Sequence, residues 1–166
     1  MTEPLDPGQL AAYFALMEVS SLLQHAVEQQ LRADGGLSWV QFQILARLAD
    51  APAGQQRMTD LADAVVYSRS GLTYQAGLLQ KAGLVTRESS AQDERSVTVT
   101  ISDSGRALVR AVLPGHIAVV RHQLLDPLTA RDLTNLTAVL GRVRDRMRAA
   151  PPRSALARSR PKPQTR

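Results

Sequence analysis

The order of three short elements in the middle of the chain constrains its fold more than any other feature. Thr59 can cap a short helix over residues 60–66, and after a tight turn Ser68 can cap a second helix over residues 69–82, which Gly83 ends. The second helix has an inner face at i, i+4 and i+7, formed by Leu72, Ala76 and Leu79. Such a pair is a helix-turn-helix candidate, although any helical bundle contains similar pairs.

A hairpin follows this pair directly. Residues 84–88 can form one strand, and in residues 96–101 apolar side chains alternate with hydroxyl side chains, a period of two. The polar segment 89–95 joins the two strands. A helix-turn-helix followed by a hairpin is a winged helix, and this order arises by chance far less often than either piece alone. The sequence therefore predicts a mainly α-helical fold with a small β-hairpin wing.

Longer helices are expected on both sides of this winged helix-turn-helix region, which spans about residues 37–101. They cover about residues 9–33, 102–125 and 129–148. The first is apolar on more than one side, which indicates a helix that is covered on more than one side, here by a second subunit. The last has a coiled-coil-like apolar seam at Leu133, Leu136, Leu140, Val143 and Met147. We therefore expect one domain over residues 1–148, with a helical dimerisation region.

Capping motifs mark where the other helices begin. Ser38 and Gln41 form a capping box at the start of the helix after the Gly35-Gly36 pair. Ser102 is placed to cap the helix after the hairpin, and Thr129 with Asp132 forms an Asp variant of the box before the last helix.

The net charge of +5 comes from the end of the chain. Five of the 20 basic residues lie in the segment 149–166, which has no acid and is rich in Pro and Arg. The remaining 15 basic residues equal the 15 acidic ones. We expect this tail to be disordered, because it cannot bury a core, and it is either an arm for DNA phosphates or a solvated end.

Several classes of function find no support in the sequence. The chain has no cysteine, which excludes disulfides and thiolate metal sites, and its three histidines lack the i, i+4 spacing of a helical metal site. It has none of the common catalytic motifs, so we expect neither an enzyme nor a cofactor. No stretch of eighteen uncharged apolar residues exists, so we expect no membrane span and a cytoplasmic protein.

The pattern resembles the MarR family of bacterial winged-helix transcription regulators over about residues 10–148. The most specific carrier is Asp93-Glu94-Arg95, similar to the wing signature Asp-x-Arg of that family, followed at family spacing by Ile101-Ser-Asp-Ser-Gly-Arg-Ala-Leu. Further carriers are Leu37-Ser-Trp-Val-Gln-Phe-Gln-Ile-Leu, Met58-Thr-Asp-Leu-Ala, Ser68-Arg-Ser-Gly-Leu-Thr and Lys81-Ala-Gly-Leu-Val.

The resemblance implies a homodimer paired through the first helix and the last two. Each subunit would lay a recognition helix in the major groove of double-stranded DNA and extend a wing toward the minor groove. It further implies a repressor of a pseudo-palindromic operator that a small-molecule ligand releases.

The candidate DNA contacts lie on the first turns of the second short helix and in the wing. They are Ser68, Arg69, Ser70, Thr73, Tyr74, Gln75 and Arg95. Arg95 either enters a narrow minor groove or pairs with Asp93 and stiffens the wing. A pocket for a small aromatic or phenolic ligand would be lined by Tyr13, Met17 and Trp39, which can equally be plain core.

Two features of the sequence favour a second interpretation. Many family members have an arginine in the recognition helix where this chain has Tyr74, and the segment 57–100 holds five basic and five acidic residues. The alternative function is therefore a winged-helix dimer that acts as a protein-interaction module with weak or no DNA binding.

Overall fold

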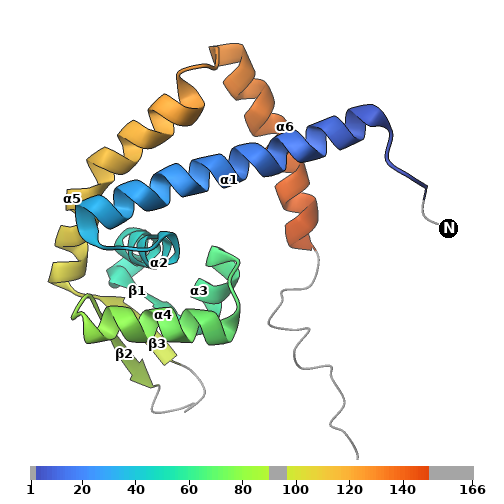
Figure 1. Ribbon diagram of the computed structural model, residues 1–166. Helices are drawn as coiled ribbons and strands as arrows, with labels where there is room; N and C mark the ends of the chain where they lie inside the picture. Colours follow the sequence, from blue (N-terminus) through green and yellow to red (C-terminus); the bar gives the residue numbers. More distant parts are fainter. Residues whose placement is uncertain (1–2, 90–96, 150–166) are drawn as a thin grey trace, which may run out of the picture.

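The computed structural model describes residues 3–89 and 97–149, and it is mainly helical with a small sheet at one end (Figure 1). The helices are α1 (Pro7–Gly35), α2 (Trp39–Asp50), α3 (Met58–Val65), α4 (Arg69–Lys81), α5 (Asp103–Val120) and α6 (Ala130–Ala149). The strands are β1 (Gln55–Arg57), β2 (Val85–Ser89) and β3 (Val97–Ile101). The fold class predicted from the sequence is confirmed. The expected helix 102–125 is α5 followed by a π-helical turn, Arg121–Leu125.

The winged helix-turn-helix region, from α2 to β3, is built around one hydrophobic core. Leu45 and Leu48 of α2 are fully buried, as is Leu61 of α3. The predicted inner face of α4 is buried in full, and its Leu72 and Ala76 are 0% exposed. On the sheet, Val99 and Ile101 of β3 are buried as the period of two predicts, while Val97 is half-buried.

The wing is a three-stranded antiparallel sheet rather than a two-stranded hairpin. β3 is its central strand, with β2 on one side and the short β1 on the other. In this register Val99 of β3 lies between Gln56 of β1 and Arg87 of β2. β1 was not predicted from the sequence, because a three-residue strand is too short to show any alternation.

The additional strand also moves the start of α3. The predicted cap at Thr59 is wrong: α3 begins at Met58, and its N-cap residue Arg57 makes no side-chain capping hydrogen bond. The chain is extended through β1 as far as Arg57, and α3 begins at the next residue, Met58. The Thr59 hydroxyl donates instead to the Asp60 carboxylate at 3.2 Å.

The other predicted caps are confirmed. Ser38 and Gln41 form both hydrogen bonds of a capping box, and Ser68 and Ser102 each accept a backbone N–H three residues on. At the start of α6, the Thr129 hydroxyl and amide both donate to Asp132, which lowers the pKa of that carboxyl. The first helix is longer than expected, because an unpredicted capping box at Asp6 begins α1 at Pro7.

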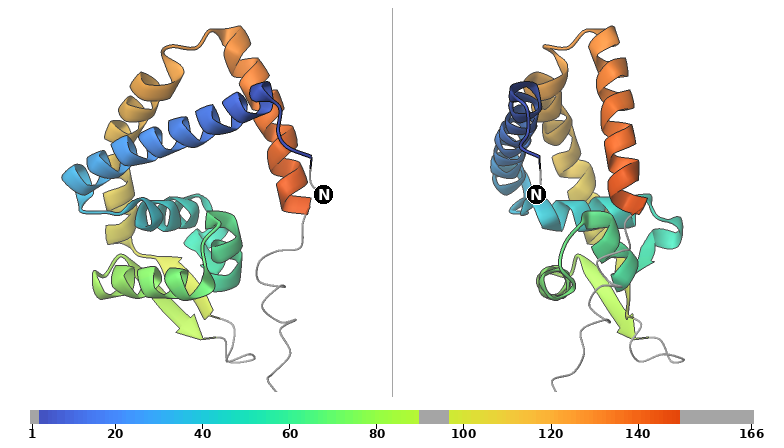
Figure 2. Two further views of the ribbon diagram at one scale, coloured as in Figure 1. Left: turned by 45° about the vertical axis from the view of Figure 1, so that its right-hand side comes forward. Right: turned by 90° about the vertical axis from the view of Figure 1, so that its right-hand side faces the viewer.

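Two of the long helices hold the winged region, and the third stands away from it. α1 packs mainly against α5, and α5 carries the chain away from the sheet before α6 turns back (Figure 1). α1 and α6 cross in Figure 1, but the right-hand view of Figure 2 shows them well separated. None of the described residues of α6 is buried. Within one chain its predicted apolar seam is therefore exposed at Leu136, Leu140, Val143 and Met147 and half-buried at Leu133.

By length and composition alone, α1 is apolar enough to cross a membrane. Its most apolar window has a mean hydropathy of 1.2. By this measure the prediction that no part of the chain could span a membrane does not hold. Only 6% of that window is buried, which places its apolar side chains on the surface of the chain. Val27 and Leu31, at the other end of α1, belong to the core.

Candidate nucleic-acid interface

The turn between α3 and α4 is held in an unusual backbone conformation. Val66 closes α3 in the left-handed region, at φ 55° and ψ 45°, with its N–H bonded to the Ala62 carbonyl. Such a conformation is rare for a β-branched side chain. The chain then straightens, and Ser68 caps α4 through the Gly71 amide at 3.2 Å. This tight turn fixes the direction in which the first turns of α4 leave the domain.

The first two turns of α4 present a polar face to solvent. The exposed side chains are those of Ser68, Arg69, Ser70, Thr73 and Tyr74, five of the residues expected to contact DNA. Tyr74 is 65% exposed and lies on the side opposite the core. The Thr73 hydroxyl donates to the Arg69 carbonyl at 2.8 Å, which fixes its rotamer. Hydroxyl and guanidinium groups on one exposed helix face are the donors that suit phosphates and base edges.

Gln75 lies differently from the other expected contacts on α4. Its side chain is half-buried, and its Oε1 is buried with no hydrogen-bond partner in the part of the chain that the structure describes. The carbonyl oxygen therefore faces the interior of the domain. Asp93 and Arg95 of the expected wing tip, together with the basic tail, lie outside the described residues.

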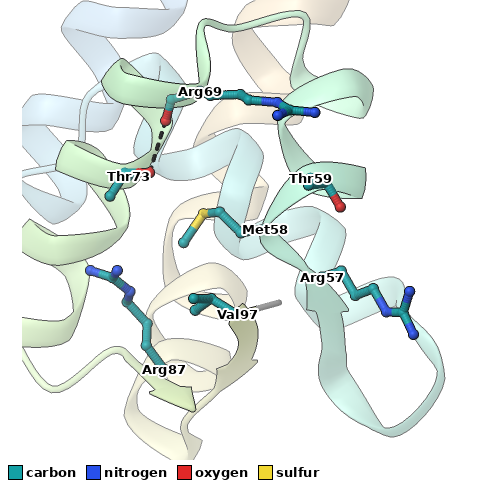
Figure 3. A pocket seen from close by; sticks show the side chains of 7 residues that line it. All are labelled: Arg57, Met58, Thr59, Arg69, Thr73, Arg87 and Val97. Atoms are coloured by element: carbon teal, nitrogen blue, oxygen red, sulfur yellow. Dashed lines mark hydrogen bonds between the residues drawn. The ribbon is translucent and has the colours of Figure 1, made fainter. Parts of the chain in front are cut away.

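A hollow of about 210 Å³ opens beside the exposed face of α4. We call it the basic hollow; it is lined by Arg57, Met58, Thr59, Arg69, Thr73, Arg87 and Val97. Figure 3 shows Met58 and Val97 in its middle and the three arginines spread around them. No acidic residue is among those that line it.

The three arginines come from different elements that are far apart in the sequence. Only one of them, Arg69, was predicted from the sequence to contact DNA. Arg69 opens α4, while Arg57 ends β1 and Arg87 lies in the middle of β2. None of the three guanidinium groups is hydrogen-bonded or ion-paired to a described residue, and the Nε of Arg87 is buried without a partner. One sequence signal could have identified Arg87: it is two residues after the buried Val85, so it lies on the inward face of its strand.

The three residues expected to line a ligand pocket are not brought together within one chain. Tyr13 and Met17 are half-exposed on the free part of α1, and the Tyr13 ring packs edge-on against Phe14. Tyr13 is 22 residues from the end of α1 at Gly35, which corresponds to about 33 Å along the helix. Trp39 follows α1 at the start of α2, so a pocket with all three requires a second copy of the chain.

Trp39 has other neighbours instead. Its ring lies 6.0 Å from that of Phe42 and 5.9 Å from that of His116, which reaches over from α5. Burial lowers the pKa of His116, whose Nδ1 is buried without a partner among the described residues. This cluster joins α2 to α5. The described residues contain no group of three or more side chains that could hold a metal ion.

Two solved structures match this arrangement over most of the chain. Sco3205 from Streptomyces coelicolor, a MarR family regulator solved in complex with DNA, is 29% identical with a TM-score of 0.82, over 87% of this chain and 91% of that one. AbsC, a MarR family regulator from the same organism, is 32% identical with a TM-score of 0.82, over 89% of this chain and 99% of that one.

More distant relatives extend the comparison. The transcriptional repressor YetL of Bacillus subtilis is 28% identical over 116 residues, which are 70% of this chain and 69% of that protein. CouR from Rhodococcus jostii RHA1, solved bound to p-coumaroyl-CoA, shares the fold at 20% identity and a TM-score of 0.69, over 80% of this chain and 90% of that one. The proteins to which this chain is similar thus include a repressor, a regulator solved with DNA and, by fold alone, a protein solved with p-coumaroyl-CoA.

The family model described as MarR family matches residues 35–96, which cover α2, the helix-turn-helix and the start of the wing. The match coincides with the region that carries the exposed face of α4. It identifies a family of transcriptional regulators rather than of enzymes. Together with the 32% identity to AbsC over nearly its whole length, it establishes that this chain belongs to the MarR family of winged-helix DNA-binding transcriptional regulators.

Proposed function

We propose that this protein is a sequence-specific, homodimeric repressor that binds a pseudo-palindromic operator and is released from it by a small aromatic ligand. The observation that carries the DNA-binding part is the exposed polar face of α4 beside the basic hollow. Hydroxyl and guanidinium donors there are supplied by residues whose positions are fixed by a capped helix and a sheet. A rigid scaffold of this kind is what direct readout of base edges requires.

The proposed dimer accounts for the apolar surface of the long helices. α6 exposes Leu136, Val139, Leu140, Val143 and Met147, and the last of these is 72% exposed. The free part of α1 exposes Leu10, Tyr13, Phe14, Leu16, Met17, Val19 and Leu22. Contiguous exposed apolar surface of this extent marks an interaction site. Since both faces belong to the same chain and neither is covered, a two-fold pair of chains can bury both at once.

A dimer also brings together two copies of the DNA-binding face, one from each chain. Two copies of α4 related by a two-fold axis can enter successive major grooves, whose centres lie about 34–36 Å apart. The ligand would act by shifting the population between dimers whose α4 helices match this spacing and dimers in which they do not. Tyr13 and Met17 of one copy and Trp39 of the other remain our candidates for the pocket. Repression is proposed by similarity to YetL, and a cytoplasmic location follows from DNA as the partner.

The oligomeric state can be tested without knowledge of the operator. We expect Val143→Glu, in the middle of the exposed seam of α6, to convert the dimer to a monomer in size-exclusion chromatography with light scattering. Ala138→Glu adds the same charge on the opposite side of α6 and should leave the dimer intact. A wild-type protein that is monomeric at micromolar concentration would contradict the proposed assembly.

Selection of bound sequences from random DNA tests the main proposal. We expect an inverted repeat to be enriched, and Tyr74→Ala to weaken binding to that repeat by about tenfold or more, since a good base contact is worth about 1–3 kcal/mol. If no sequence is enriched, the alternative function, a protein-interaction module, is favoured. The balanced charge of the segment 57–100 supports that alternative. Transcription assays with and without the protein then give the sign of regulation.

A further inference from the structure

The basic hollow is shaped for an extended anion rather than for a compact one. In Figure 3 the guanidinium of Arg69 reaches toward Thr59, that of Arg87 lies on the other side below Thr73, and that of Arg57 points away from both. Three cations that converged on one point would fit a single small anion. Cations spread around an apolar centre fit a chain of negative charges that runs past them.

We propose that the basic hollow seats the sugar-phosphate backbone of one DNA strand, with Arg57, Arg69 and Arg87 contacting its phosphates and with Met58 and Val97 facing deoxyribose. This inference rests on the proposed DNA-binding function and adds Arg57 and Arg87 to the contacts expected from the sequence. Arginine suits phosphate because its planar guanidinium offers several donors in a fixed geometry.

Arg87 carries the strongest part of the argument. It crosses from β2 toward α4, where a Cβ built on Gly77 would lie 3.6 Å from its Nη1. This is an ordinary van der Waals distance, so the guanidinium lies against the helix at Gly77. Arg87 lines the hollow, and its guanidinium has no hydrogen-bond or ion-pair partner among the described residues, so it can donate to a phosphate oxygen there. The wing strand therefore places a cation beside the middle of α4, between its own Arg69 and Lys81.

The hollow also explains how a charge-balanced region can bind a polyanion. The arginines gather on one side of the domain, at the junction of α3, α4 and the sheet, and no acidic side chain lines the space between them. Binding through phosphate contacts depends on how charges are segregated, because each neutralised phosphate releases condensed counterions.

The dependence of affinity on salt tests this inference with the full-length protein. The operator obtained by selection is titrated by fluorescence anisotropy between about 50 and 200 mM KCl, the range over which phosphate contacts have large effects. We expect Arg57→Gln and Arg87→Gln each to reduce the log–log slope by about 0.9 per subunit, or about 1.8 per dimer. Sequence preference should stay unchanged, since phosphate contacts carry no base information.

Matched variants separate this effect from a loss of structure. Arg131→Gln removes the same charge at the far end of the molecule, at the start of α6, and should leave the slope unchanged. Arg87→Lys keeps the charge and should restore most of the slope. Equal melting temperatures of Arg87→Gln and the wild type would show that the fold is kept.

Three outcomes would overturn the inference. An unchanged slope for Arg87→Gln with intact operator binding would show that the hollow does not bind the DNA backbone, and it would not affect the proposed function. A slope reduced as much by Arg131→Gln as by Arg87→Gln would assign the effect to the overall charge of the protein and not to the hollow. A wild-type protein that binds no DNA would overturn the proposed function, and this inference with it.

Discussion

The Ser102 hydroxyl donates a 2.7 Å hydrogen bond to the carbonyl oxygen of Gly83 and accepts the N–H of Gly105 at 3.0 Å. Gly83 follows α4 and Ser102 precedes α5, so one side chain joins the end of the proposed recognition helix to the start of a long helix. The Ser102 amide adds a 3.0 Å bond to the Leu84 carbonyl. Because α5 packs on α1, this junction couples the orientation of α4 to the helices of the proposed dimer.

Removal of this hydroxyl should lower stability. We expect Ser102→Ala to reduce the free energy of unfolding by about 1–2 kcal/mol, because it deletes an N-cap and leaves the Gly83 carbonyl without its side-chain donor. Urea unfolding followed by circular dichroism measures the change. Ser104→Ala, two residues on at an exposed helical position, is the matched control and should change stability by less than about 0.5 kcal/mol. Equal losses in both variants would show that the cap contributes nothing.

Local features of the fold were predictable from the sequence, and features that depend on distant residues were not. The caps at Ser38, Ser68 and Ser102 need only residues within three positions of themselves. β1 exists only because β3, more than 40 residues later, supplies its partner, and Gln55–Arg57 shows no pattern of its own. The start of α3 was misplaced for the same reason.

In the candidate site, too, local features were predictable and features that depend on distant residues were not. The exposed positions of α4 follow from its helical period, once Leu72 and Ala76 define the inner face. The meeting of Arg57, Arg69 and Arg87 could not be predicted, because three separate elements bring them together. The position of Arg87 beside Gly77 was equally unpredictable, because it depends on how β2 packs against α4.

Gly105 permits a close approach between α5 and the segment before the wing. A Cβ at this position would collide with the Leu84 carbonyl oxygen and would meet Cγ1 of Ile101 at 2.8 Å. We expect Gly105→Ala to lower the free energy of unfolding by about 1–3 kcal/mol, since backbone has to shift to accept it. Thermal unfolding measures the effect.

Gly141 in α6 is the matched control for this substitution. A Cβ there meets nothing within 4 Å, and the residue is helical. Gly141→Ala should therefore stabilise the protein by about 0.5–1 kcal/mol through helix propensity. A Gly105→Ala variant as stable as Gly141→Ala would contradict the close approach.

Val66 stores backbone strain in the helix-turn-helix. It is 58% exposed, so its side chain gains little from burial, while its φ of 55° is unfavourable for a β-branched residue. We expect Val66→Asn to raise the free energy of unfolding by about 0.5–1 kcal/mol, because asparagine tolerates the left-handed region. Val66→Thr keeps the β-branch and should bring no gain. An asparagine variant less stable than the wild type in urea unfolding would show that the turn is not strained.

His116 should make stability depend on pH. Burial beside Trp39 and Phe42 lowers the pKa of its imidazole from the usual 6.5, and the unfolded chain restores that value. As pH falls below about 6.5 the unfolded chain takes up the proton first, so the free energy of unfolding decreases until the pH reaches the pKa of the folded state. His116→Phe keeps a ring in the cluster and should flatten this dependence, whereas His122→Phe, at an exposed position, should not. Urea unfolding of the three proteins between about pH 5 and 8 measures the slopes, and equal slopes for His116→Phe and the wild type would assign the dependence to other groups.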